Sequence, residues 1–413
     1  MKPIEPLVIK TYEASVQLRA ASEKQIKGAL NMLASLVEDN TSQIIKANQL
    51  DLQKQAPDNP RNDRLLLNEQ RIQAIANSIR AISRLPNPSN KKILSQKLLN
   101  GLLLEKHAVP LGVVGAIYES RPNVTFDVAA LCLRSQNACL LKGSSEAYET
   151  NRAALKLITK ALKENDIPPA CITLLPPDRE AVQELMTATR YVDVIIPRGS
   201  DALIQYVRKN SLVPVIETGA GVCHLYVEQQ ANMKKAVNIA VNAKVSRPSV
   251  CNAIDAILVD EAIAQTFLEQ LAPALQTHGV VIYADAKAYK LLKQYPHLQK
   301  AAPTDFGREF LSLQCAIKVV KGIDEALLHI RKFSTKHSEA IVSENKQNCK
   351  RFIQEVDAAA VYTNASTRFT DGEEFGLGAE IGISTQKLHA RGPFALEKLV
   401  TEKWVVQGNG QVR

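Results

Sequence analysis

Residues 138–175, ACLLKGSSEAYETNRAALKLITKALKENDIPPACITLL, contain the pattern that decides the fold. Two short apolar runs, Ala138–Lys142 and Cys171–Leu175, flank a longer amphipathic stretch at Tyr148–Asn165. Short apolar runs of this length indicate buried strands, and apolar residues at helical spacing indicate a helix. Two strands joined through a helix form a βαβ unit, whose strands run parallel. The segment therefore predicts a parallel sheet covered by helices.

The same alternation extends in both directions along the chain. Residues 11–85 are helical in pattern, and Ser22 followed by Gln25 predicts a capping box, whereas residues 59–62 predict a turn. The alternation breaks near Val222, so we expect two α/β domains. The other predicted strands are Val113–Tyr118, Val192–Ile196, Val213–Ile216, Ala253–Val259, Val280–Tyr283, Leu313–Val320, Ala340–Ser343 and Ala359–Thr363, and the second block has helical patterns at Glu261–Leu275 and Asp324–Phe333.

Composition excludes several classes of protein. The chain has 413 residues, of which 46% are hydrophobic and 23% are charged, so it is neither a disordered nor a collagen-like sequence. The longest apolar run, Ala108–Tyr118, is shorter than the roughly 20 residues that cross a bilayer. The N-terminal stretch MKPIEPLVIKTYEA lacks the apolar core of a secretory signal. We therefore expect a cytoplasmic protein without a membrane partner.

The net charge and the cysteine content indicate which classes of binding partner suit the protein. The net charge is +9, which suits nucleic acid, an anionic membrane or anionic small molecules. Basic residues are spread along the chain and aromatic residues make up only 5%, so we expect no nucleic-acid partner and favour phosphorylated metabolites. The seven cysteines include no CxxC pair, which predicts free thiols in a reducing compartment and no metal site.

One cysteine and one glutamate stand out as candidates for chemistry. Cys251 lies in the loop SRPSVCN, four residues after Arg247, and a thiol beside a guanidinium ionises more easily. Glu217 follows the apolar run PVI and precedes Gly219 and Gly221. The alternatives are a small core cysteine and a structural carboxylate bound by backbone N–H groups.

The spacing of these two residues and several longer motifs resembles a known family. A strand-end Glu217 followed after 34 residues by a loop Cys251 is similar to the aldehyde dehydrogenase superfamily. Within it, six motifs resemble the gamma-glutamyl phosphate reductase family, also called glutamate-5-semialdehyde dehydrogenases. They are PLGVVGAIYESRPNVT at 110–125, LLKGSSEA at 140–147, PRGSDALI at 197–204, VSRPSVCNA at 245–253, EEFGLGAEIGIS at 373–384 and TQKLHARGP at 385–393.

The resemblance implies an activity and a domain organisation. The implied reaction is the NADPH-dependent reduction of L-glutamyl 5-phosphate to the 5-semialdehyde through a thioester on Cys251, the second step of proline synthesis. A hydrolytic aldehyde dehydrogenase, in which Glu217 activates water, and a silent nucleotide-binding protein are the alternatives. The implied fold is a Rossmann-type cofactor domain, an α/β catalytic domain and a small oligomerisation arm. The expected ranges are 1–98, 112–222 and 370–388 for cofactor binding, 223–369 for catalysis, and 99–111 and 389–413 for oligomerisation.

The resemblance also implies roles for individual residues in the reaction. Asn123, in ESRPN, is the counterpart of the side chain that stabilises the oxyanion, although the usual Pro-Trp-Asn is absent here. Arg121 is expected to bind the acyl phosphate, and a surface ion pair is its alternative. Arg247, His389 and Arg391 are expected to bind substrate, with a salt bridge between domains as the alternative for Arg391.

For the cofactor, the resemblance points to NADP rather than NAD. Lys142 would contact the adenosine ribose, and Ser144 and Ser145 follow it. Ser145 stands where many relatives that prefer NAD have a glutamate that repels a 2′-phosphate. The resemblance places Glu309 on the nicotinamide ribose.

A second candidate cofactor segment follows the predicted strand Val192–Ile196. Arg198, Gly199 and Ser200 open a predicted helix at this point. A helix N-terminus that contains a glycine presents backbone N–H groups to an anion, so these three residues could bind the pyrophosphate. The alternative is a plain helix cap.

The expected partners follow from the same resemblance. They are a small-molecule substrate, further copies of the chain in a homodimer or homotetramer, and glutamate 5-kinase in a transient association. The segments Leu98–Val109 and Val400–Arg413 could pair with another subunit, and an edge strand and a frayed terminus are the alternatives.

Overall fold

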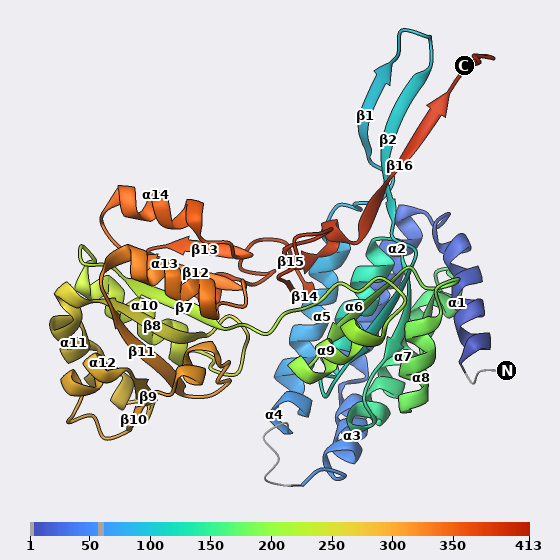
Figure 1. The fold of residues 1–413 in the computed structure, drawn as a ribbon. Coiled ribbons are helices and arrows are strands. Elements are labelled where there is room, and N and C mark those ends of the chain that lie inside the picture. Colours follow the sequence, from blue (N-terminus) through green and yellow to red (C-terminus); the bar gives the residue numbers. More distant parts are fainter. Residues whose placement is uncertain (1–3, 57–61) are drawn as a thin grey trace. The chain divides into compact units, whose positions relative to one another are not determined.

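A computed structural model describes residues 4–56 and 62–413 and divides the chain into two units. The first unit comprises Met1–Thr218, Gly376–Gly382 and Pro393–Arg413, and the second comprises Gly219–Phe375 and Ile383–Gly392. Each unit has a parallel sheet flanked by helices, so the predicted α/β class is confirmed (Figure 1). The predicted turn at 59–62 lies mostly outside the described residues.

The sheet of the first unit has the strand order β5-β4-β3-β6, and every pairing in it is parallel. Strands β3 and β4 are buried along their whole length, as expected for a parallel sheet covered on both faces. The strands are β3 (Val113–Tyr118), β4 (Ala138–Lys142), β5 (Ile172–Leu174) and β6 (Val194–Arg198). The helices are α1 (Glu5–Leu18), α2 (Glu23–Asp39), α3 (Thr41–Leu52), α4 (Asn62–Leu65), α5 (Glu69–Arg84), α6 (Asn123–Arg134), α7 (Tyr148–Lys163), α8 (Arg179–Thr187) and α9 (Asp201–Asn210).

One predicted strand in this unit was wrong. Residues 213–216 form no strand, and Val215 makes only an isolated bridge with Ile195. Ile195 donates its N–H to the carbonyl of Pro214 at 2.8 Å and accepts from the N–H of Ile216 at 2.9 Å. The pairing stops there because proline has no N–H to continue a ladder.

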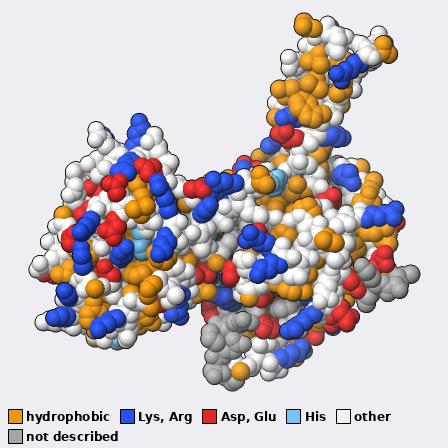
Figure 2. All heavy atoms as spheres, in the orientation of Figure 1, with side chains coloured by type: hydrophobic (Ala, Val, Ile, Leu, Met, Phe, Trp, Pro, Cys, Tyr) orange, Lys and Arg blue, Asp and Glu red, His pale blue; other side chains and the backbone are white. Residues whose placement is uncertain are grey.

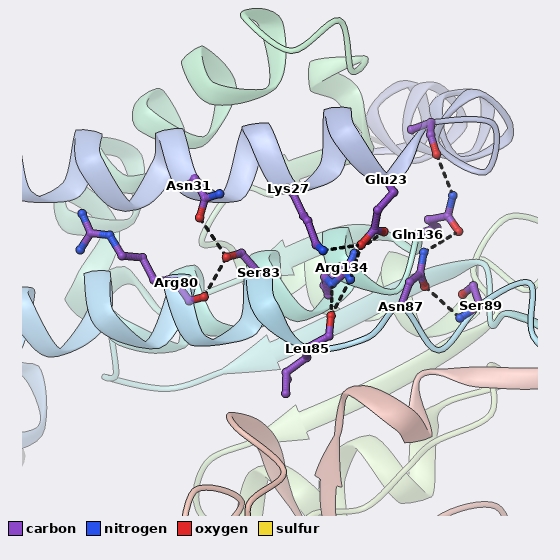
Figure 3. A network of polar contacts seen from close by, with 11 residues as sticks. Glu23, Lys27, Asn31, Arg80, Ser83, Leu85, Asn87, Ser89, Arg134 and Gln136 are labelled. Atoms are coloured by element: carbon purple, nitrogen blue, oxygen red, sulfur yellow. Dashed lines mark hydrogen bonds and ion pairs between the residues drawn. The ribbon is translucent and has the colours of Figure 1, made fainter.

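A buried arginine joins three helices of the first unit (Figure 3). Arg134, at the end of α6, is fully buried and donates to both carboxylate oxygens of Glu23 at 2.7 Å. Its Nε also donates to the carbonyl of Leu85, which follows α5, at 2.8 Å. Beside it, the predicted capping box at Ser22 and Gln25 is confirmed. The capping box fixes the start of α2, whose first residue, Glu23, accepts from Arg134.

The second unit has a longer parallel sheet with the order β10-β9-β11-β8-β7-β12-β13. Its central strands are buried, and the strand β7 was not predicted from the sequence. The strands are β7 (Cys223–Val227), β8 (Ile254–Asp260), β9 (Val281–Ala284), β10 (Leu298–Lys300), β11 (Gln314–Val320), β12 (Ser338–Val342) and β13 (Ala360–Thr363). The helices are α10 (Met233–Val245), α11 (Ala264–Gln276), α12 (Ala286–Leu291), α13 (Gly322–Phe333) and α14 (Lys346–Glu355).

An antiparallel arm extends from the first unit (Figure 1). Strand β2 (Leu103–Pro110) pairs with β1 (Lys92–Lys97) on one side and with β16 (Val400–Gln407) on the other. The arm therefore pairs the two segments singled out in the sequence, Leu98–Val109 and Val400–Arg413. Strand β1 belongs to the arm as well, although the expected range 99–111 omits it. Its surface bears exposed apolar side chains (Figure 2), among them Ile93, Leu94, Leu99, Trp404 and Val406.

Two further strands, β14 (Glu380–Ser384) and β15 (Gly392–Ala395), pair with each other, and each has residues in both units. No helix in the described ranges is both long and apolar enough to cross a membrane.

Candidate active site

Cys251 lies in a turn between α10 and β8 of the second unit. The turn closes through a hydrogen bond from the Ala253 N–H to the Val250 carbonyl at 3.1 Å. The thiol is partly buried, whereas the cysteines at 132, 139, 171, 223 and 315 are fully buried. Burial raises the pKa of Cys315 to about 12, and Cys349, the other partly exposed cysteine, has its pKa raised by burial and by Glu228. Cys251 is therefore the thiol whose surroundings best suit a nucleophile.

The inner side of this turn rests on the chain that leads into β7. The Cys223 thiol donates to the Cys251 carbonyl at 3.2 Å. Gly221 lies even closer, because a Cβ at this position would be 1.6 Å from the Cys251 carbonyl oxygen. Only glycine permits this approach. The N–H of Gly221 donates to Glu309 Oε1 at 2.9 Å, so the structure links two predicted site residues, Cys251 and Glu309, through one glycine.

The outer side of the turn is fastened to a segment more than a hundred residues away in sequence. The buried Asn252 amide donates to the carbonyls of Arg368 at 3.3 Å and Thr370 at 3.0 Å. In return, Arg368 Nη1 donates to Asn252 Oδ1. Arg247 is exposed, and its charge lowers the pKa of Arg368, although burial of Arg368 is the larger cause. The sequence reasoning missed Arg368, because no local motif pairs it with the Cys251 turn.

The first unit contains the predicted cofactor residues at the carboxyl ends of its strands. Lys142 ends β4, and its ammonium donates to the carbonyls of Gly143 and Pro177, both at 3.0 Å. Burial lowers the pKa of Lys142 to about 8, opposed by the charge of Asp178. Ser144 accepts from the N–H of Ser120 at 3.3 Å, and Ser145 is exposed.

The segment Arg198, Gly199 and Ser200 contains a helix cap, and an anionic side chain is bound beside it. Ser200 caps α9 by accepting from the N–H of Leu203 at 3.4 Å. The carboxylate of Glu119 accepts from the Ser200 N–H at 2.8 Å and from its hydroxyl at 3.1 Å. The start of α9 therefore holds an anionic group, which in this structure belongs to the chain itself.

Gly199 makes room for that carboxylate. A Cβ at this position would lie 2.6 Å from Glu119 Oε2 and 2.9 Å from a methyl carbon of Leu203, both closer than real Cβ contacts. Beside it, Arg198 Nε is buried and has no hydrogen-bond partner in the described part of the chain. The neighbour of Gly199 at the start of α9 is therefore Glu119, and contact of Gly199 with a pyrophosphate stays a prediction.

The other predicted catalytic residues of the first unit have partners of their own. Glu217 Oε1 lies 3.3 Å from Arg208 Nε, in an ion pair with an exposed arginine of α9. Asn123 opens α6, where its amide donates to Asp127 Oδ2 at 3.1 Å. Arg121 is partly buried and precedes this helix. Of the predicted catalytic residues, Asn123 and Glu217 belong to the first unit and Cys251 to the second.

Arg391 belongs to an ion-pair cluster within the second unit. Its Nη1 donates to Asp357 Oδ1 at 2.7 Å, and Lys336 and Lys387 lie 3.4 Å and 3.0 Å from the other oxygen. These cations hold the pKa of Asp357 well below its usual range, with Arg391 as the first cause. His389 is exposed and adopts a positive φ of 64°. Arg391 therefore forms an ion pair within one unit, whereas the alternative had placed its salt bridge between domains.

Comparisons with known proteins show the family to which the chain belongs. The model of the aldehyde dehydrogenase family matches residues 4–286. The chain is 50% identical over 407 residues to the gamma-glutamyl phosphate reductase of Chlorobium phaeobacteroides, covering 98% of this chain and 97% of that protein. It is 51% identical to the same-named protein of Chlorobaculum parvum, covering 97% and 96%.

A solved structure is similar over the full chain. The crystal structure of gamma-glutamyl phosphate reductase from Thermotoga maritima has 43% sequence identity and a TM-score of 0.94, and the match covers 99% of each chain. The family model, the full-length relatives and this structure lead to the same conclusion. The chain belongs to the aldehyde dehydrogenase family.

Proposed function

We propose that this protein reduces L-glutamyl 5-phosphate to L-glutamate 5-semialdehyde with NADPH and releases phosphate, the second step of proline synthesis. The observation that carries the proposal is the Cys251 turn, in which Gly221, Cys223 and Asn252 fix the backbone that bears a partly exposed cysteine. The full-length relatives that bear the name gamma-glutamyl phosphate reductase support the choice of substrate.

The strand ends of the first unit suit the binding of NADP. Ligands of open parallel sheets bind beyond the carboxyl ends of the strands, where Lys142 and Arg198 lie. A Cβ on Gly143 would lie 2.3 Å from the Asn151 amide, so the backbone after β4 is held close to α7. We assign Lys142, Ser144 and Ser145 to the adenosine side. When bound, the cofactor supplies a hydride.

Two more regions complete the proposed cofactor site. The pyrophosphate is assigned to Arg198, Gly199 and Ser200. Glu119 would have to give up its hydrogen bonds to Ser200 for this group to bind. Glu309 is assigned to the nicotinamide ribose, and its Oε1 already accepts from the Gly221 N–H, which leaves its other oxygen for a hydroxyl. We assign most of the cofactor-binding residues to the first unit, whereas the nucleophile Cys251 belongs to the second.

The first covalent step needs only the thiol and its surroundings. Cys251 Sγ attacks the acyl carbon, the bond from that carbon to the phosphate oxygen breaks, and phosphate leaves with the electron pair. The tetrahedral intermediate has an oxyanion that requires donors fixed in advance, and we assign Asn123 and the Cys251 N–H to this role. Asn123 would have to exchange its hydrogen bond to Asp127 for one to the oxyanion.

Glu217 is assigned a role other than activating water. The thioester must be protected from water, because its hydrolysis would consume substrate before the hydride is transferred, and Glu217 is already paired with Arg208. We propose that Glu217 helps to deprotonate Cys251 or orients the nicotinamide.

The remaining assignments concern substrate and partners. Arg121 and Arg247 are assigned to the phosphate end of the substrate, and His389 and Arg391 to its α-carboxylate. The exposed apolar side chains of the arm suit contact with a second copy of the chain, in a homodimer or homotetramer. We also propose a transient association with glutamate 5-kinase and, because all seven cysteines are free, a cytoplasmic location.

The direct test replaces the nucleophile. Cys251→Ala should lower kcat by about 10⁴-fold or more while the dissociation constant of NADPH changes less than about twofold. Cys349→Ala is the matched control, because Cys349 is the other partly exposed thiol, and it should retain full activity. Comparable kcat values for Cys251→Ala and the parent protein would remove covalent catalysis from the proposal.

A further inference from the structure

A second arginine, absent from the predicted site, spans the turn that bears Cys251. Arg368 Nε donates to Ser246 Oγ at 3.1 Å, and its Nη1 donates to Asn252 Oδ1. Ser246 lies at the start of the turn and Asn252 directly follows the cysteine. The guanidinium plane is therefore fixed at two of its three nitrogens by the two ends of one turn.

The backbone beneath Arg368 is fixed as well. Besides the two hydrogen bonds from the Asn252 amide to the carbonyls of Arg368 and Thr370, the Thr367 hydroxyl donates to the Asn252 carbonyl at 2.6 Å. A side chain held by so many contacts loses little conformational entropy when it binds a ligand. Pre-organisation of this kind is typical of a recognition residue.

Arg368 also retains unused donor capacity. Within residues 4–56 and 62–413, its Nη2 has no hydrogen-bond partner, and the side chain is only partly buried. Neither Arg368 nor Arg247 forms an ion pair with a carboxylate in this part of the chain. Asp371 and Glu374 act on Arg368 only through their charges.

Two guanidiniums, those of Arg247 and Arg368, act on each other electrostatically beside the Cys251 turn. Burial lowers the pKa of Arg368, Arg247 lowers it further, and the charges of Asp371, Cys251 and Glu374 raise it. An arginine remains protonated despite such a shift. Two cations close together and not neutralised by a bound carboxylate favour a multiply charged anion.

We infer that Arg368, with Arg247 beside it, binds the phosphate group that is expelled when the Cys251 thiolate attacks the acyl carbon. The inference rests on the proposed function and adds Arg368 to the residues assigned to the phosphate end of the substrate. As the carbon–oxygen bond breaks, the electron pair passes to the phosphate oxygen, and the guanidinium N–H groups stabilise that charge. In the reverse direction, the same site holds inorganic phosphate for attack on the thioester, and the thiolate is the leaving group.

The test measures alkylation of Cys251 by anionic iodoacetate and by neutral iodoacetamide, with peptide mass spectrometry as the readout. Inorganic phosphate should protect Cys251, and Cys349, whose neighbour is Glu228, provides an internal reference in the same samples. Arg368→Gln should lower the iodoacetate rate at Cys251 by roughly three- to tenfold, change the iodoacetamide rate less than about twofold and abolish protection by phosphate. Arg331→Gln, which removes an exposed arginine from α13, should change none of these.

Two further measurements keep the result interpretable. Arg368→Lys retains the positive charge but loses the planar guanidinium that can bind phosphate through two N–H groups. The ratio of the iodoacetate rate to the iodoacetamide rate at Cys251 should therefore stay within about twofold of the parent value, and protection by phosphate should weaken. In the oxidation of the semialdehyde by NADP, Arg368→Gln should raise the KM for phosphate by about tenfold or more without a similar change for NADP. Unchanged phosphate protection and KM in a folded Arg368→Gln variant would overturn the inference. Absence of phosphate-dependent oxidation in the parent protein would instead overturn the proposed function.

Discussion

Gly221 provides the sharpest structural prediction about the Cys251 turn. In Gly221→Ala, the new methyl group would lie 1.6 Å from the Cys251 carbonyl oxygen and 2.6 Å from its carbonyl carbon. Real Cβ contacts below 3.0 Å essentially do not occur, so the two backbones must separate by about 1.4 Å. No side-chain rotation can relieve this contact, because the backbone of residue 221 fixes the position of the Cβ and the atoms that it meets are backbone atoms of Cys251. A displacement of about 1 Å at a catalytic group costs on the order of 100-fold in rate, and we expect a loss of that size in kcat/KM.

The assay compares steady-state reduction, the iodoacetamide rate at Cys251 and the thermal unfolding midpoint. Gly279→Ala is the matched control, since Gly279 is in the same unit, has a positive φ of 63° and has no atom within 4 Å of an added Cβ. The control should lose some stability through backbone strain but keep its kcat/KM within about twofold. Equal kcat/KM values for Gly221→Ala and Gly279→Ala would refute the claim that this close approach positions the nucleophile.

Three further predictions test the first unit. Ser145→Glu should raise the KM for NADPH by about tenfold through repulsion of the 2′-phosphate and leave the KM for NADH almost unchanged; equal effects on both would show that Ser145 does not face that group. Because the pKa of Lys142 is lowered to about 8, its charge is present below that pH and lost above it. The affinity for NADPH, measured by calorimetry, should therefore fall roughly three- to tenfold between pH 7 and pH 9. Lys142→Met should bind NADPH weakly at both pH values. Arg134→Met should lower the free energy of unfolding of this unit by about 2–3 kcal/mol, since the Leu85 carbonyl loses its donor and Glu23 keeps only Lys27 as a partner. Arg134 is the first cause, and Lys27 a smaller one, of the lowered pKa of Glu23, which is about 2. The stability difference between parent and variant in urea titrations should therefore be full above about pH 4.5 and shrink as the pH falls toward 2, and a constant difference would contradict this account.

Local sequence patterns were sufficient for most of the fold. The capping box at Ser22 and the apolar runs that became strands depend on neighbouring residues only. Strand β7, CHLYV, was missed because it includes a histidine. The ring of His224 is fully buried there because Glu339 of β12, distant in sequence, accepts from its Nδ1 at 3.0 Å. Such compensation cannot be inferred from the strand itself.

The same distinction applies to the site. Cys251 and Gly221 stand in recognisable motifs, although the motif does not reveal that the glycine touches the cysteine backbone. Arg368 and Asn252 are 116 residues apart, and their pairing arises only when η5 (Thr367–Phe369) packs beside the Cys251 turn. The ion pair of Glu217 with Arg208 is likewise a tertiary contact, and it changes how that carboxylate is interpreted.

The fate of the thioester tests the central claim most directly. The protein is incubated with L-glutamate 5-semialdehyde and NADP, with and without inorganic phosphate, and the products are separated. We predict that NADPH formation requires phosphate, that glutamyl phosphate or its cyclised product predominates over free glutamate, and that Glu217→Gln slows the reaction without changing this ratio. Abundant free glutamate formed without phosphate by the parent protein, and lost in Glu217→Gln, would contradict the account and identify a hydrolytic dehydrogenase.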